Sequence, residues 1–444
     1  MKTSHLALAL LLALCTAPVI GCDGNDNDNN TNVPSGNTGE LTKTVKSALA
    51  RADSKISDAD LKAFVKGQYD LNYDILRKSG DDIAKKNAMI STYSIQTALA
   101  MAWAGADGET ASEMQKALNF GVHAHEALNK LDKTIMALNK DAEESEYEIV
   151  DAMEISTENS LYLAPGYQWA SEWLDTLAVN YGVGITEMNF AADPEAARKY
   201  INDAVSKTTH ERINDLLPSG SINAATSSVI TNAIYFKAPW ADEIRKSKDK
   251  LDFNKADGSK VQVDMLAHSG HLQYAKGEDF QAVVEPLRDR AFEMMFILPD
   301  EGKFDSVMAS MNGEKLFGIF DALKDNKQVV LQFPMYEFTT SLMLKGTLNQ
   351  LGMSQAFTDA ADFSKMTSDG TSGLSISDVI HKTFIGVDEK GVEAAAATAI
   401  LIQASAAYET EVELTIDRPF MFVIYEHSTH TPLFVGHVMD PSAK

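Results

Sequence analysis

The feature that most constrains this chain is the run 394–408 near its C-terminus, which contains no charged residue, no proline and no glycine. In a strand that continues from residue 392, alternate side chains would share one face. These residues are apolar apart from a single threonine, and they are Val392, Ala394, Ala396, Thr398, Ile400 and Ile402. Such small side chains let a strand enter between two others with little repacking. Four consecutive alanines also favour a helix, so periodicity alone leaves a helix and an interior strand open.

The composition is that of a globular protein able to build a sizeable core. Hydrophobic residues make up 45% and charged residues 23% of the 444 residues. The formal net charge of −24 argues against a nucleic-acid partner, because phosphates require a basic surface. The two cysteines, Cys15 and Cys22, precede the globular part, so we expect no disulfide within the fold.

The N-terminus has the pattern of a secretory signal. A basic residue, Lys2, is followed by the apolar run 6–14, which is too short for a comfortable membrane span, and by Val-Ile-Gly-Cys at 19–22. This last motif resembles a bacterial lipobox and implies removal of residues 1–21 and lipidation of Cys22. The alternative is an ordinary signal peptide with an incidental cysteine. Residues 22–40 are rich in Asn, Asp and Gly, and we interpret them as a disordered tether.

Helical patterns dominate the first part of the chain and strand patterns the later part, which predicts an α+β fold. Ser57 has the character of a helix N-cap, and the sequence from Thr110 to Glu113 reads as a capping box that opens another helix. Two apolar runs, 420–425 and 433–438, predict a buried hairpin. No break in composition divides the chain, so we expect one domain over 41–444 with its core from about residue 57.

Sequence motifs for catalysis are missing. There is no nucleophile elbow, no Gly-rich phosphate loop and no His-Glu-x-x-His motif. His123 and His125 could share a metal, but a solvated loop explains them better because no carboxylate or cysteine ligands cluster in sequence near them. We therefore expect no enzyme activity, no cofactor and no metal site.

Several motifs resemble those of the serpin family of protease inhibitors, and the resemblance covers nearly all of 57–444 in the family's order. Glu389 and the following Gly391, Val392, Glu393, Ala394, Ala395, Ala396, Ala397 and Thr398 resemble the hinge of inhibitory members. Further motifs resemble the family's shutter and breach regions, and their residues are Asn87, Ser91, Ser94, Asn232, Trp240 and His381. The C-terminal segments 417–420 and 433–436 resemble the family's C-terminal signature.

The resemblance implies the serpin fold, with helices, a five-stranded main β-sheet, smaller sheets and an exposed reactive loop. It also implies suicide inhibition, in which a protease cleaves the loop, forms an acyl-enzyme and is trapped when the loop inserts into the main sheet. We accordingly expect Val392 to lie in solvent before cleavage and in the core afterwards. Some residues depart from the family pattern in ways that bear on how the sheet opens; they are Thr92, Ala204, Ile244 and Met335.

Counting from the hinge glutamate as the family does places the reactive bond at Ser405–Ala406, with Tyr408 as the rival. Small flanking residues indicate an elastase-like serine protease, Tyr408 would suit a chymotrypsin-like one, and papain-like cysteine proteases are a further class of partner. The expected protein is a monomer, anchored by lipid on Cys22 to the bacterial cell envelope, at the outer membrane. The alternatives are a non-inhibitory serpin that acts as a binding module, a surface adhesin or structural lipoprotein, and an enzyme.

Overall fold

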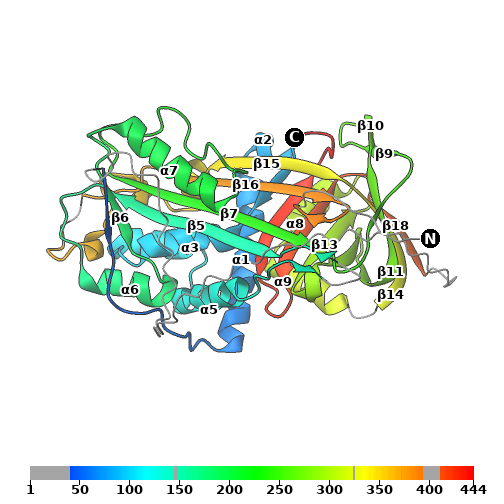
Figure 1. Cartoon of the computed structure of the whole chain (residues 1–444), viewed down its shortest axis with the longest axis horizontal. Coiled ribbons are helices and arrows are strands. Elements are labelled where there is room, and N and C mark those ends of the chain that lie inside the picture. Colours follow the sequence, from blue (N-terminus) through cyan, green and yellow to red (C-terminus); the bar gives the residue numbers. More distant parts are fainter. Residues whose placement is uncertain (1–40, 145–148, 324–325, 372, 394–410) are drawn as a thin grey trace, which may run out of the picture. The chain divides into compact units, whose positions relative to one another are not determined.

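The computed structural model describes residues 41–144, 149–323, 326–371, 373–393 and 411–444. The predicted signal, lipid attachment site and tether therefore lie outside the described residues, as do hinge positions 394–398 and the proposed reactive bond. Within the described part, two large sheets and a set of helices form one unit (Figure 1). No helix among these residues is long and apolar enough to cross a membrane.

Among the described residues, the main sheet has seven strands where five were expected. Its order is β1 (Thr42–Val45), β6 (Ile185–Met188), β5 (Glu154–Leu163), β7 (Ser228–Pro239), β17 (Gly391–Val392), β16 (Val379–Asp388) and β15 (Tyr336–Met343). The number exceeds five because the short strand β1 adds to one edge and the two-residue strand β17 lies between β7 and β16. The central strand β7 is buried along nearly its whole length. The edge strand β15 alternates buried and exposed residues, because only one of its faces packs on the core.

The second sheet contains the predicted C-terminal hairpin. Its order is β18 (Val412–Thr415), β14 (Asn326–Pro334), β11 (Met265–Lys276), β12 (Phe280–Pro286), β13 (Phe292–Pro299), β19 (Phe420–Glu426), β20 (Pro432–Val438) and β2 (Ala88–Ile90), with β8 (Arg245–Lys246) paired to β11. Every residue of β19 and β20 is buried. The short pairs are β9 (Leu251–Asn254) with β10 (Lys260–Val263), and β3 (Glu143–Glu144) with β4 (Ile149–Val150).

Helices occupy both faces of the main sheet (Figure 1). They are α1 (Asp58–Lys78), α2 (Asp81–Ala84), α3 (Thr92–Trp103), α4 (Gly108–Ala117), α5 (Ala124–Met136), α6 (Ser171–Tyr181), α7 (Pro194–Thr208), α8 (Phe304–Ser310), α9 (Gly313–Ala322) and α10 (Lys345–Gln350). Helix α3 contacts β5 and β7 on one side and β20 on the other. Helix α7 contacts β5 and β7, and in Figure 1 it lies in front of the sheet while α3 lies behind it.

The two predicted helix starts had different outcomes. The Ser57 hydroxyl accepts a hydrogen bond from the Asp60 backbone N–H, so Ser57 is the N-cap of α1. The prediction that a capping box from Thr110 to Glu113 opens this helix was wrong, because α4 begins at Gly108, two residues before Thr110. Glu113 instead accepts hydrogen bonds from the backbone N–H groups of Ser354 and Gln355, and so joins α4 to a distant loop.

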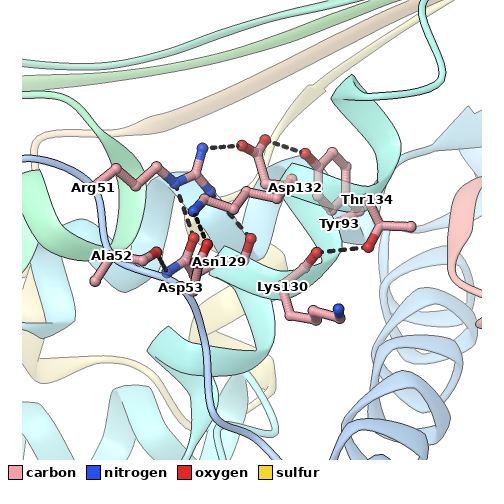
Figure 2. Close-up of polar contacts among 9 residues, drawn as sticks. Arg51, Ala52, Asp53, Tyr93, Asn129, Lys130, Asp132 and Thr134 are labelled. Atoms are coloured by element: carbon pink, nitrogen blue, oxygen red, sulfur yellow. Dashed lines mark hydrogen bonds and ion pairs between the residues drawn. The ribbon is translucent and has the colours of Figure 1, made fainter.

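Residues 41–56 pack on the domain, ahead of the point where the sequence predicted the core to begin. Figure 2 shows Arg51 donating to the Asn129 side-chain oxygen at 2.9 Å and to Asp132 at 2.6 Å, while the Tyr93 hydroxyl donates to the other Asp132 oxygen at 2.5 Å. Tyr93 lies on α3 and is fully buried. This segment therefore fastens α5 to the core, and β1 adds a strand to the main sheet.

Candidate functional site: the hinge, the breach and the shutter

The hinge begins inside the main sheet rather than in solvent. Gly391 and Val392 form β17, which pairs with Pro239 and Ala238 of β7 on one side and with Asp388 and Val387 of β16 on the other. Val392 is only 2% exposed. The expectation that Val392 lies in solvent before cleavage was therefore wrong: the chain turns back immediately after β16, and the apolar side chain fills the space between two buried strands.

Gly391 is required by the close approach of β7. A Cβ atom at this position would lie 2.2 Å from the carbonyl oxygen of Ala238 and 2.7 Å from the Cα of Pro239. Any side chain would push the hinge out of the gap, so the glycine makes the start of the inserted strand possible.

Trp240 holds the turn that leads into the hinge. Its backbone N–H donates to the carbonyl oxygen of Lys390 at 3.1 Å, and its indole N–H donates to that of Asp388 at 2.8 Å. The indole is 6% exposed and stands edge-on to Phe333 at 5.6 Å. Trp240 therefore fixes both carbonyl groups of the breach turn, whereas Glu389 in the same turn points into solvent.

A buried polar cluster, which we call the shutter cluster, joins β5, β7 and β16 to the start of α3. The Asn232 amide donates to the Ser94 hydroxyl at 2.5 Å and to Asn159 at 2.7 Å, and its oxygen lies 2.5 Å from Nδ1 of His381. The Ser91 backbone N–H donates to Nε2 of His381 at 3.1 Å. Asn159 of β5 was not predicted from sequence, because a single asparagine in a strand gives no distinguishing signal.

The imidazole of His381 is neutral in this setting. Since Nε2 accepts from Ser91, the ring proton lies on Nδ1 and is donated to Asn232. Complete burial lowers the pKa of His381 to about 3. The shutter cluster is therefore an uncharged hydrogen-bond network, located where β7 and β16 pair directly through Ile230–Ala233 and Val379–Lys382.

Asn87, which was grouped with the shutter residues, lies elsewhere. Its side chain donates to the carbonyl oxygens of Asp440 and Ala443 and accepts from the backbone N–H groups of Met439 and Asp440. It therefore fastens the C-terminal tail of the chain and makes no hydrogen bond with the shutter cluster.

The structure shows the surroundings of all four residues that depart from the family pattern. The Thr92 hydroxyl accepts from the Asn72 amide at 2.7 Å and donates to the carbonyl oxygen of Gln68 at 3.2 Å, so it is satisfied against α1. Met335 is partly buried and lines a cleft beside Asp388 and Glu393. Ala204 is half-buried on α7, and Ile244 is 4% exposed in the core.

The described residues contain no group of three or more His, Cys, Asp or Glu side chains that could hold a metal. His123 instead contacts Glu126, and His125 contacts the Tyr181 hydroxyl at 2.6 Å and stacks on Trp103.

Comparison with known proteins establishes the family. Residues 66–441 match the family model described as "Serpin (serine protease inhibitor)". An uncharacterized serpin-like protein of Thermococcus kodakarensis is 31% identical over 97% of this chain and 98% of its own length. The leukocyte elastase inhibitor of Xenopus tropicalis is 29% identical over 83% of this chain and 97% of its own length. The chain belongs to the serpin family.

A solved structure agrees with the fold. The crystal structure of a thermophilic serpin, tengpin, in its native state is similar with a TM-score of 0.75 and 26% sequence identity, and the match covers 90% of this chain and 100% of that one. The sequence-based expectation of a serpin fold is thus confirmed, and the family is one of protease inhibitors rather than catalysts.

Proposed function

We propose that this serpin inhibits serine proteases by suicide cleavage of its reactive loop and insertion of that loop into the main sheet. The observation that carries the proposal is the position of β17, which already occupies the gap between β7 and β16 at the breach. At the other end of the gap the two strands pair directly. The sheet therefore has a defined place for one further strand.

The register of β17 supports the same conclusion. If the pairing of Gly391 and Val392 continued along β7 and β16, Thr398 would come opposite both Asn232 and His381. Thr398 is the single polar residue on the apolar face of the hinge run, and it would reach the level of the polar shutter cluster. The hinge run therefore matches the gap between β7 and β16 in the polarity of its side chains as well as in their small size, as insertion requires.

The reactive bond in this proposal is Ser405–Ala406, and the target is an elastase-like serine protease. The small residues around that bond support this choice, as does the similarity to a protein named for inhibition of leukocyte elastase. Cleavage after Tyr408 by a chymotrypsin-like enzyme is the rival, and papain-like cysteine proteases are a further class of target.

A non-inhibitory serpin that acts as a binding module or surface lipoprotein is the alternative. Many such members carry charged or proline-bearing hinges. Here the hinge carries four small, uncharged residues, Ala394, Ala395, Ala396 and Ala397. Val392, which precedes them, lies buried inside the sheet. Both observations favour the inhibitory function.

A panel of proteases tests the proposal. Elastase-like enzymes mixed with the protein should give a one-to-one complex that survives boiling in detergent, with the cut mapped near Ser405 by mass spectrometry. Cleavage of the loop by every protease without any loss of protease activity would refute inhibition.

We further propose that lipid on Cys22 anchors the protein at the outer membrane of a bacterial cell envelope, with residues 22–40 as the tether. Replacing Cys22 by serine should remove the acyl mass and release the protein from the membrane fraction. A wild-type protein without acyl mass, or a variant that remains in the membrane fraction, would contradict the anchor.

A further inference from the structure

One ion pair holds the end of β17, and its cationic partner comes from outside the sheet. Glu393 directly follows the inserted pair and is 6% exposed. Its carboxylate accepts a hydrogen bond from Nε of Arg212 at 2.5 Å. Arg212 lies in the loop that follows α7, a helix that packs on β5 and β7 of the main sheet. The contact therefore joins this loop to the hinge.

The backbone at Glu393 stops the inserted strand. Its N–H still donates to the carbonyl oxygen of Gly386 at 2.6 Å, as a strand residue would, but its φ is +50°. A non-glycine residue rarely adopts this left-handed conformation. The side chain that Arg212 binds therefore belongs to the residue at which the strand pairing ends.

Arg212 is itself well positioned. Its guanidinium lies 5.2 Å from the ring centre of Phe384 on β16, and its side chain lines a cleft of about 590 Å³ together with Glu393 and Phe384. The side chain is 42% exposed, whereas that of Glu393 is 6% exposed. The pair thus has one buried member and one that water can still reach.

Because Glu393 is buried and Arg212 is partly exposed, Glu393 depends on Arg212 more than Arg212 depends on Glu393. Burial raises the pKa of Glu393, and Arg212 opposes that rise. Removing Arg212 would leave the buried carboxylate without the cation to which it is hydrogen-bonded, with only the weaker influence of His210 and Lys237 remaining, which is costly. Removing the charge of Glu393 would leave an arginine that water can solvate, which is much less costly.

We propose that Arg212 is a positioning residue that keeps the hinge docked in the main sheet, so that insertion of the cleaved loop starts from a strand end that is already formed. The docking role of Arg212 depends only on the geometry described above. Its role in trapping a protease rests on the proposed inhibitory function. Without Arg212, the buried carboxylate would draw Glu393 into solvent and Val392 with it.

Thiol labelling tests the docking without any protease. In the full chain with Cys15 and Cys22 replaced by serine, Val392→Cys places one thiol at the buried position, and its rate of reaction with iodoacetamide reports hinge opening. Arg212→Gln should raise this rate about tenfold or more, as expected for loss of a charge-assisted hydrogen bond to a buried group. Arg212→Lys should restore part of the protection.

The decisive variant is the double replacement. Adding Glu393→Gln to Arg212→Gln should slow labelling again, because no charge is then left to bury. Arg245→Gln, which removes an exposed arginine bonded to Glu243, is the matched control and should change nothing. Thermal unfolding by circular dichroism checks that each variant is folded. Equal labelling rates with and without Arg212, or no slowing in the double variant, would overturn the docking role.

The role in trapping is measured as the number of loops cleaved for each protease trapped. Arg212→Gln should raise this number while the rate of loop cleavage stays unchanged. An unchanged number would show that the docked hinge does not start insertion. If the wild-type protein traps no protease at all, the proposed function fails, and labelling still decides whether Arg212 docks the hinge.

Discussion

At the residue scale, Val392 shows what the sequence could and could not predict. The alternation of side chains between the two faces of a strand was enough to predict that Val392 lies on the apolar face. Its position in the uncleaved protein depends on how far β7 and β16 are separated at the breach, and no local pattern encodes that distance. Arg212 was not predicted for a related reason, since nothing in its neighbouring sequence indicates a partner at Glu393.

Replacing Val392 by arginine should therefore affect the protein before cleavage as well as after it. The charge cannot remain at a site that is 2% exposed, so we expect the hinge to undock and the intact loop to become more sensitive to non-target proteases. The variant should still be cut at the reactive bond but trap poorly. Val392→Thr, which is small and uncharged, is the control. Trapping by Val392→Arg equal to the wild type would contradict insertion of this hinge.

His381 gives a prediction about pH. Its pKa is lowered to about 3 in the folded protein from an ordinary value of 6.5, so the unfolded chain binds the proton more readily. Its contribution to stability is present above about pH 6.5 and is lost as the pH falls towards 3, by at most about 1.4 kcal/mol per pH unit. His381→Gln should therefore flatten the fall in unfolding free energy between about pH 6 and pH 4. A fall as steep in His381→Gln as in the wild-type protein would contradict the assignment.

At the scale of elements, the sequence predicted strongly patterned segments well and their junctions poorly. Strands β19 and β20 were found because two apolar runs flank a short polar turn. The start of α4 was misplaced because Thr110 and Glu113 fit a capping box, while in the fold both bind distant backbone N–H groups. The shutter cluster was only partly predicted, since Asn159 joins it through the pairing of β5 with β7.

The junction of α1 and α3 provides a test at this scale. Thr92 is the first residue of α3, a position where the helix backbone tolerates proline. Thr92→Pro should nevertheless cost about 1–3 kcal/mol of unfolding free energy, because the buried Asn72 amide loses its acceptor. Thr92→Val removes the hydroxyl group while keeping the shape and should cost a similar amount in chemical denaturation. If Thr92→Pro were as stable as the wild type, the hydroxyl contacts would not be what couples the two helices.

At the scale of the whole molecule, the proposed insertion into the gap between β7 and β16 predicts that the uncleaved fold is not the most stable arrangement of the chain. Among the described residues, Gly391 and Val392 occupy that gap at the breach, and four residues on each strand pair directly at its other end. A cleaved loop could add roughly a dozen paired residues, which at about 1 kcal/mol for each net hydrogen bond gives on the order of 10 kcal/mol. The uncleaved form would then persist because of a kinetic barrier.

Nicking the loop should therefore raise the melting temperature. Cleavage within 403–408 by a non-target protease, followed by thermal unfolding, should increase the melting temperature by at least about 10 °C, because the new strand completes the main sheet. Ala396→Arg is the matched control: this position has the parity of Val392, so insertion would force a charge into the core and the nicked variant should gain far less. The shutter cluster must also part for the strand to pass, so the rise should develop with time after the nick rather than at once. A nicked wild-type protein that melts at the temperature of the intact one would show that β17 is a fixed end of the sheet and not the start of an inserting strand.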